Sequence, residues 1–287
     1  MKAMVMENVK QHRNNGEEAL EISYFGADHH RMFGALHRPA GKGHTGLIFC
    51  PSYGDEMVVS YTPFARWAKE LAQKGFAVFR YHPYGVGESD GTSADFSFES
   101  AVSDAITAAR FFQEKASVDR IGFVGLRFGG RVAIEAAVLK KVDLIVLWSP
   151  ILSLRQYCRD LMRLRLTTEL VHQQAEQVRV TSRGMIAELE AGRSIDLLGL
   201  ELSPEFYKQM NADPPLPENS PAPEMLWLAR SGERFLATKV VGGWSKSSQH
   251  VDLQVLRENA FWEEHSSDFP RQFANASLAW LLKGRSR

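Results

Sequence analysis

The segment 120–137, RIGFVGLRFGGRVAIEAA, constrains the fold of this chain most strongly. Its apolar first part reads as a strand, which leads through a turn flanked by Gly125 and Gly129 into an alanine-rich helical stretch. The same change from a strand-like to a helix-like pattern recurs along the chain. Such alternation is typical of a mostly parallel sheet with helices packed on it. We therefore predict an α/β fold built around this segment.

The other elements follow from the hydrophobic pattern. Residues 19–39 read as two strands joined by a tight Gly-Ala-Asp turn, so the sheet is expected to begin with an antiparallel hairpin. Further strands are predicted at 45–50, 76–82, 119–125, 142–148, 225–232 and 251–258. Helices are predicted at 61–75, 98–115, from Arg127 onward, at 236–248 and at 271–283.

Residues 151–223 interrupt this alternation. Their pattern is long, amphipathic and charged, and it ends in a proline-rich stretch. We predict a helical lid inserted into the core, which divides the chain into an N-terminal tail (1–18), a first part of the core (19–150), the lid (151–223) and a second part of the core (224–287). Leucines and arginines interleave along 154–165, so one face of this helix is expected to cover either a ligand pocket or the partner in a homodimer.

The composition of the chain limits the kinds of partner that we expect it to bind. The 34 basic residues balance the 34 acidic ones without a Lys/Arg-rich block, which argues against nucleic acid and favours a small-molecule partner. The N-terminus turns polar before a hydrophobic segment of signal length, and no apolar run approaches a membrane span. Cys50 and Cys158 lie far apart and form no metal-binding spacing. We therefore expect a cytoplasmic protein with no membrane span, metal or other cofactor.

The order of the elements resembles the α/β-hydrolase fold across nearly the whole chain. RYHPYGVGESDG at 80–91 is similar to the D-x-x-G-x-G-x-S segment of that superfamily, with His82 in place of the acidic residue. More narrowly, YFGADHHRMFGALHRPAG, FCPSYGDEM and LLGLELSPEFYKQM resemble hydrolases associated with exosortase and polysaccharide export loci, which are related to the serine aminopeptidase branch. The resemblance implies an α/β-hydrolase fold with a lid.

At the strand-to-helix turn, this superfamily carries G-x-S-x-G with a nucleophilic serine. The five positions here are Gly125, Leu126, Arg127, Phe128 and Gly129. A guanidinium has donors but no usable lone pair, so Arg127 is not a nucleophile. Two interpretations stay open. Arg127 either pairs with a nearby carboxylate of an inactive site, such as Asp55 or Glu56, or it joins the helix amides in binding the carboxylate or phosphate of a ligand.

The resemblance implies a histidine in the loop after the last strand, and His265 lies there. Its acidic neighbours are expected to raise its pKa, which suits a general acid or an ion pair. Glu233 follows the penultimate strand, where the superfamily places the acid, and Asp268 is a weaker candidate. Each of these three residues is equally explained as a solvated surface group.

The loop CPSYGDEM follows the first central strand, where the resemblance places an oxyanion site. Amides near Ser52 and Tyr53 are expected to join that of Phe128 in holding an oxyanion. Cys50, Ser52 and Ser89 are the alternative nucleophiles, but a core cysteine, a turn serine and a loop serine explain them better.

Three functional hypotheses follow. The first is an esterase, thioesterase or acyl transferase that binds an acyl or carboxylate group at Arg127 and uses His265 or a water molecule. The second is a catalytically inactive member of the superfamily that binds an acyl or carboxylate ligand, or a partner protein. The third is a lyase or isomerase that stabilises an enolate with the oxyanion frame.

Overall fold

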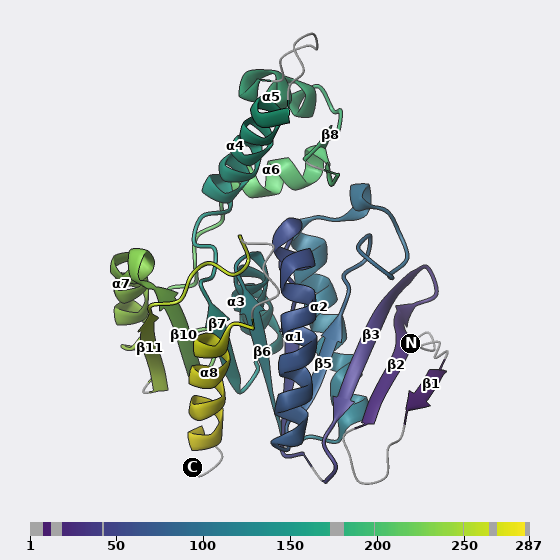
Figure 1. Ribbon diagram of the computed structural model, residues 1–287, viewed down its shortest axis with the longest axis vertical. Coiled ribbons are helices and arrows are strands. Elements are labelled where there is room, and N and C mark those ends of the chain that lie inside the picture. Colours follow the sequence, from purple (N-terminus) through teal and green to yellow (C-terminus); the bar gives the residue numbers. More distant parts are fainter. Residues whose placement is uncertain are drawn as a thin grey trace.

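The computed structural model describes residues 8–12, 19–41, 43–172, 181–197, 199–248, 250–263 and 269–284. Its centre is a nine-stranded sheet in the order β1-β2-β3-β5-β4-β6-β7-β10-β11 (Figure 1). The strands are β1 (Asn8–His12), β2 (Ala19–Ala27), β3 (His30–Arg38), β4 (Thr45–Cys50), β5 (Ala77–Tyr81), β6 (Arg120–Leu126), β7 (Leu144–Trp148), β10 (Glu224–Arg230) and β11 (His250–Leu256).

The strand directions identify the fold class. β2 and β3 form an antiparallel hairpin, and β3 also runs antiparallel to β5. From β5 through β4, β6, β7 and β10 to β11 every neighbouring pair is parallel. This order, with β4 and β5 exchanged in space and antiparallel strands confined to its N-terminal end, is that of the α/β-hydrolase fold. The predicted fold class is therefore confirmed.

Helices cover both faces of the sheet. α1 (Asp55–Gln73) and α8 (Arg271–Gly284) lie on one face, where Trp67, Trp148 and Phe273 are buried together. α2 (Phe98–Ala116), α3 (Phe128–Lys140) and α7 (Arg234–Trp244) lie on the other, with a core that includes Phe112 and Phe123. The central strands are buried on both faces, which explains why β6 and β7 read as nearly continuous apolar runs.

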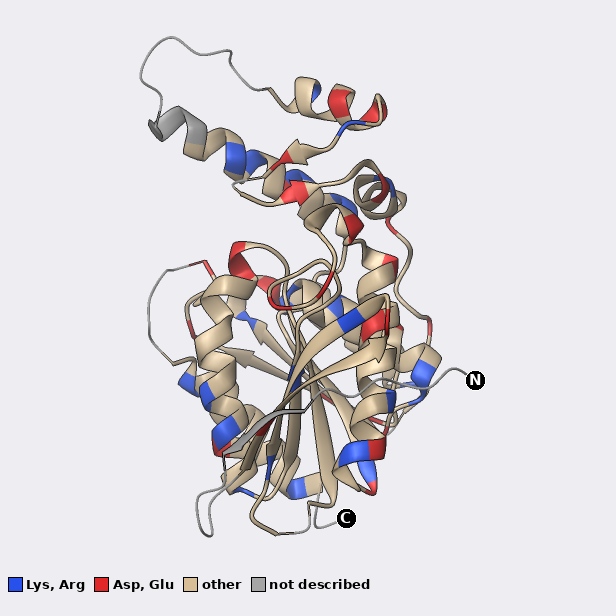
Figure 2. Ribbon diagram, turned by 90° about the vertical axis from the view of Figure 1, so that its right-hand side faces the viewer, with Lys and Arg blue, Asp and Glu red and all other residues tan. Residues whose placement is uncertain are grey.

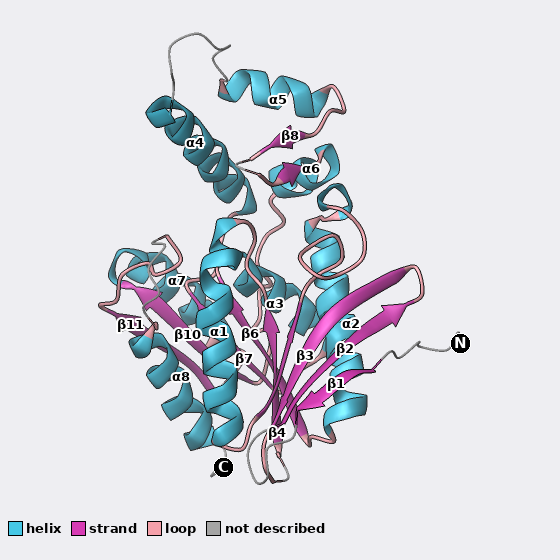
Figure 3. Ribbon diagram, turned by 45° about the vertical axis from the view of Figure 1, so that its right-hand side comes forward, coloured by secondary structure: helices cyan, strands magenta, loops and turns pink. Residues whose placement is uncertain are grey.

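The chain between β7 and β10 forms a helical insertion over the carboxyl ends of the parallel strands (Figure 3). It contains α4 (Leu154–His172), α5 (Ser182–Glu190), α6 (Pro204–Ala212) and the short antiparallel pair β8 (Ile195–Asp196) and β9 (Glu201–Leu202). Ser203 caps α6 by accepting a hydrogen bond from the amide of Phe206, and Pro204 fits the first helical turn. Residues 173–180 of the expected lid lie outside the described residues.

Two boundaries differ from the sequence prediction. Residues 8–12, placed in the N-terminal tail, form the edge strand β1 paired with β2. Helix α1 begins at Asp55 rather than near residue 61, because Asp55 and Glu56 put carboxylates in its first turn, where the helix dipole favours negative charge. The second difference bears on the site, since it places Glu56 on a rigid element.

Charges of both signs are interspersed over the core helices and the insertion (Figure 2). Among the residues that the structure describes, no helix is long and apolar enough to cross a membrane. The same residues include no group of three or more His, Cys, Asp or Glu side chains placed to hold a metal ion.

We expect His37 on β3 to make the protein sensitive to acid. Burial, together with the charges of Arg80 and Lys69, lowers the pKa of His37 from 6.5 to about 3. Below pH 6.5 the His37 side chain therefore binds a proton in the unfolded chain but not in the folded protein. The free energy of unfolding consequently falls as the pH drops toward 3. The expected loss at this residue is about 2 kcal/mol between pH 8 and pH 5. Urea unfolding of wild type and His37→Gln checks this, and equal pH slopes in the two proteins would contradict it.

Candidate active site at the strand-to-helix elbow

Arg127 stands at the apex of the turn between β6 and α3. Its backbone has φ 52° and ψ −116°, a conformation that L-residues rarely adopt and that costs about 1–3 kcal/mol. The Arg127 amide donates to the carbonyl of Trp148 at 3.0 Å, and its own carbonyl accepts from the amide of Ile151 at 3.1 Å. These two hydrogen bonds, to residues on either side of the turn that follows β7, hold the strained backbone of Arg127 in place.

The two flanking glycines are needed for close packing. A Cβ atom on Gly125 would overlap the carbonyl oxygen of Gly129, and one on Gly129 would overlap the carbonyl oxygens of Cys50 and Pro51. At these two glycines the elbow, the start of α3 and the loop after β4 therefore touch through backbone atoms. This contact explains the glycine spacing that the sequence displays.

The side chain of Arg127 pairs with Glu56 in the first turn of α1. Nε of Arg127 lies 3.0 Å from Oε1 of Glu56, and the hydroxyl of Tyr157 on α4 donates to Oε2 at 3.1 Å. The guanidinium also lies 5.6 Å from the ring centroid of Trp262. The side chains of Arg127 and Glu56 are 20% and 14% exposed, so water still reaches both. Of the two carboxylates expected as partners, Glu56 is the one in contact.

Charge and burial act in opposite directions on this cluster. Burial raises the pKa of Glu56, and the charge of Arg127 with the hydrogen bonds from Arg127 and Tyr157 offsets only part of that rise. Burial lowers the pKa of Arg127, but attraction to Glu56 outweighs it and the pKa is raised. Burial also raises the pKa of Tyr157, and the Glu56 charge adds to this. Arg127 thus stays charged and Tyr157 protonated, while Glu56 is the member of the three that can exchange a proton.

The residues expected to form the oxyanion loop surround the elbow. The Ser52 hydroxyl donates to the carbonyl of Leu126 at 2.8 Å, which ties the loop after β4 to the end of β6. Tyr53 packs against Phe128, with ring centroids 5.9 Å apart, and Phe128 begins α3. The Tyr53 hydroxyl is buried without a partner among the described residues. Ser52, Tyr53 and Phe128 are therefore brought together, as their sequence positions suggested.

The alternative nucleophiles have structural roles here. Cys50 is buried, and burial raises the pKa of its thiol. The Ser89 hydroxyl donates to the carbonyl of His82 at 2.7 Å and accepts from the amide of Phe33 at 2.9 Å. The Ser52 hydroxyl is bound to Leu126. None of these three side chains is placed to attack a substrate at the elbow.

Glu233 lies near the site but not in contact with the elbow. It ends the short 3₁₀ turn Ser231–Glu233 and accepts from the amide and Nε of Arg230 at 3.0 and 3.2 Å. The Arg230 guanidinium lies 5.1 Å from the ring centroid of Trp262, the same ring that Arg127 approaches. His265 and Asp268 lie outside the described residues, so their roles remain predictions.

Sequence reasoning did not foresee Tyr157, Trp262 or Arg230. Tyr157 was part of the apolar stripe of the insertion, and its hydroxyl gave no separate signal. Trp262 reaches the site through the packing of the segment after β11, and Arg230 does so from the end of β10.

Comparisons with solved structures agree with the topology. A putative hydrolase from Agrobacterium vitis shares 15% identity with a TM-score of 0.59, and the match covers 97% of this chain and 99% of that one. Est1E from Butyrivibrio proteoclasticus, solved with ferulic acid bound, shares 13% identity, TM-score 0.62 and coverage of 92% and 99%. An esterase from Pyrococcus furiosus shares 14% identity, TM-score 0.60 and coverage of 92% and 90%. At these identities the likeness shows the fold.

No curated protein matches the chain by sequence. A family model does: that of the hydrolase family described as serine aminopeptidase, S33, matches residues 56–238, more than half of the chain. The matched range begins at Glu56 and includes the elbow and the insertion. Together with the fold, this match supports a hydrolase-type function, and the chain belongs to the serine aminopeptidase (S33) family of hydrolases.

Proposed function

We propose that the protein hydrolyses an acyl ester or thioester by direct attack of water, with Glu56 as the general base and Arg127 in the position of the missing serine. The observation that carries the proposal is the contact between Glu56 and Arg127 at the elbow. It places a buried carboxylate of raised pKa beside a fixed cation, and such pairs with perturbed pKa values concentrate at catalytic sites. A carboxylate whose pKa moves toward neutrality is also a better general base than a solvated one.

The chemistry needs a base and an oxyanion donor, and the cluster offers both. Glu56 takes a proton from water as the water oxygen bonds to the acyl carbon. Arg127 uses only Nε in its hydrogen bond to Glu56 among the described residues, so its terminal nitrogens can donate to the developing oxyanion. The amide of Phe128 at the helix start adds a further donor. When the tetrahedral intermediate collapses, the alcohol or thiol leaves with the proton held by Glu56, and the carboxylic acid remains.

The helical insertion lies over the elbow, where it can cover the acyl group of a substrate. Tyr157 on α4 stacks on Phe128 with ring centroids 6.0 Å apart and donates to Glu56, so α4 covers the elbow directly. We infer that the insertion acts as a lid that limits the size of the acyl group. A homodimer through the outer face of α4 remains a prediction.

A second candidate is an inactive family member that binds an acyl or carboxylate ligand without turnover. The engagement of Arg127 by Glu56 and Trp262, with no hydroxyl or thiol at the apex, favours it. The third hypothesis, enolate chemistry in a lyase or isomerase, needs His265 as acid or base and has no support from the described residues.

Hydrolysis of p-nitrophenyl butyrate and butyryl-CoA in the presence of a fluorophosphonate tests the first proposal. We expect turnover that the reagent does not inhibit, because no activated serine takes part. Inhibition together with a labelled serine would contradict the proposal. Absence of turnover with both substrates, with butyrate bound to the protein, would favour the second candidate.

The pH dependence of this activity should follow Glu56. The base must be ionised, so kcat/KM is expected to fall as the pH drops through the raised pKa of Glu56. Because that pKa lies above the ordinary 4.5, the decrease should begin at a higher pH than for a solvated glutamate. A pH–rate profile for p-nitrophenyl butyrate measures this, and a rate that stays constant down to pH 4.5 would rule out Glu56 as the base.

A further inference from the structure

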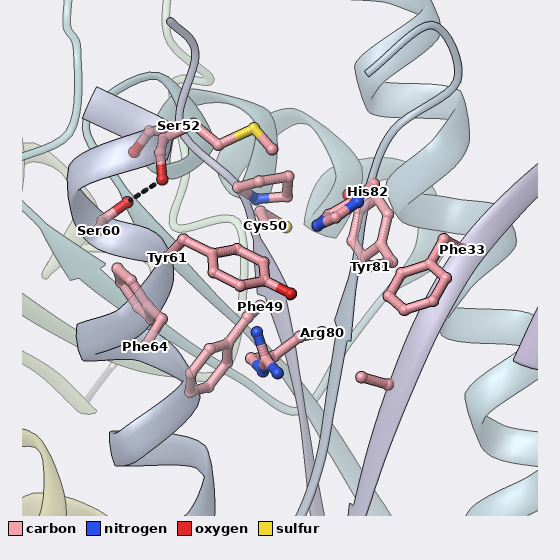
Figure 4. Close-up of a pocket in the computed structure, with 13 residues that line it drawn as sticks. Phe33, Phe49, Cys50, Ser52, Ser60, Tyr61, Phe64, Arg80, Tyr81 and His82 are labelled. Atoms are coloured by element: carbon pink, nitrogen blue, oxygen red, sulfur yellow. Dashed lines mark hydrogen bonds between the residues drawn. The ribbon is translucent and has the colours of Figure 1, made fainter. Parts of the chain in front are cut away.

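A hollow lies beside the loop after β4, between α1 and strands β3 and β5. It is partly open to solvent. Its walls are mostly aromatic and come from Phe33 on β3, Phe49 on β4, and Tyr61 and Phe64 on α1 (Figure 4). Arg127 does not line it. Aromatic walls of this kind suit the flat or short apolar body of a small ligand.

Arg80 on β5 places a positive charge in this hollow. Its Nε donates to Nε2 of His37 at 3.3 Å, and its guanidinium lies 5.2 Å from the ring centroid of Tyr61 (Figure 4). Neither neighbour is a carboxylate, and the described residues give Arg80 no ion pair. Burial lowers the pKa of Arg80. A partly buried cation without an anion is unfavourable, so this position favours a negatively charged ligand.

His82 supplies a second donor on the same side. Its Nδ1 accepts a hydrogen bond from the amide of Glu88 at 3.0 Å, which assigns the proton of the neutral ring to Nε2. Burial, with the charge of Arg80, lowers the pKa of His82 and keeps the ring neutral. The described residues provide no acceptor for Nε2. The ring also packs against Tyr61 and Phe33, which form the walls.

A wider groove between α2, α3 and α6 provides a contrast. Its lining includes the carboxylates of Glu99, Glu135 and Glu205 and a single cation, Lys208. The excess of negative charge in this groove disfavours the binding of an anion there. The smaller hollow combines aromatic walls with a cation that has no ion pair among the described residues, and the groove does not.

We propose that the hollow between α1, β3 and β5 binds a small monocarboxylate with an aromatic or short apolar body. The carboxylate accepts from the guanidinium of Arg80 and from Nε2 of His82, and the apolar body lies among Phe33, Phe49 and Phe64. The hollow shares Ser52 with the loop beside the elbow, but Arg127 does not line it, and the inference does not rest on the proposed hydrolysis.

Phenylacetate is a suitable probe, with phenylacetamide as its neutral control. Nuclear magnetic resonance of protein labelled at the methionine methyl groups reports binding, because Met57 lines the hollow. We expect phenylacetate to shift the Met57 methyl signal, and phenylacetamide to bind at least about tenfold more weakly, because it lacks the charge that Arg80 attracts. Binding that is lost in Arg127→Ala and kept in Arg80→Gln would place the ligand at the elbow and overturn this inference while leaving the proposed hydrolysis intact.

Two variants test whether the charge of Arg80 is needed to bind phenylacetate. Arg80→Gln should weaken phenylacetate binding at least about tenfold, whereas Arg110→Gln on the exposed side of α2 should not change it. Equal binding to Arg80→Gln and wild type would overturn the inference. If Arg80→Gln does not fold, the comparison of acid and amide on the wild-type protein still decides, since equal affinities would exclude a site built on Arg80. A wild-type protein that binds no phenylacetate at millimolar concentration would also overturn the inference.

Discussion

Replacing Glu56 by glutamine is expected to lower kcat/KM for p-nitrophenyl butyrate by about 10²–10⁴-fold. The amide has the shape of the carboxylate and can still contact Arg127 and Tyr157, but it cannot take a proton from water. KM should change little, because the substitution removes a proton transfer in the transition state and not a contact that binds the substrate. The effect should therefore appear almost entirely in kcat.

Glu70→Gln is the matched control for this measurement. Glu70 lies on the same helix, is exposed, and is distant in sequence from the elbow. We expect its kcat/KM to equal that of wild type. If Glu56→Gln kept the activity of Glu70→Gln, Glu56 would not be the base.

The second large effect is on stability. Arg127→Ala should lower the free energy of unfolding by about 3 kcal/mol, because it leaves the carboxylate of Glu56 buried without its cation. Adding Glu56→Gln removes that charge, so the double variant should lose less than the sum of the single variants. We expect a coupling energy of about 2 kcal/mol from the double-mutant cycle, measured by urea unfolding.

A control arginine separates this coupling from a general effect of charge removal. Arg110→Ala on the exposed side of α2 should change the free energy of unfolding by no more than about 0.5 kcal/mol. Additive losses for Arg127→Ala and Glu56→Gln would mean that the pair contributes nothing to stability. The elbow would then be held by its backbone bonds to Trp148 and Ile151 alone.

The elbow could be predicted because its signal is local. The spacing of Gly125 and Gly129 reflects backbone contacts that tolerate no Cβ atom, and an arginine at the apex cannot supply the nucleophile that a serine supplies there. The choice between Asp55 and Glu56 could not be made, because it depends on where α1 begins. Starting the helix at Asp55 puts Glu56 within reach of Arg127.

The contacts between residues far apart in the sequence could not be predicted from any local sequence pattern. Tyr157 reaches the elbow because the first turn of α4 lies against the start of α3, and Trp262 because the segment after β11 returns to the site. The pocket near Arg80 depends on the antiparallel pairing of β3 with β5, which sets His37 beside Arg80. In the sequence, Arg80 belongs to a predicted strand and His82 replaces the acidic residue of the D-x-x-G-x-G-x-S segment, and neither pattern predicted a pocket. Strand β1 was missed because its segment is polar and pairs at the edge of the sheet.

The most direct test of hydrolysis without a nucleophile is rapid-quench intact-mass spectrometry of the wild-type protein during turnover of p-nitrophenyl butyrate. If water attacks the acyl carbon directly, p-nitrophenolate should be released linearly, without a burst, and no butyryl group should appear on the protein at any time. A butyryl adduct that forms and decays at the rate of turnover would contradict the account, as would a complete absence of product.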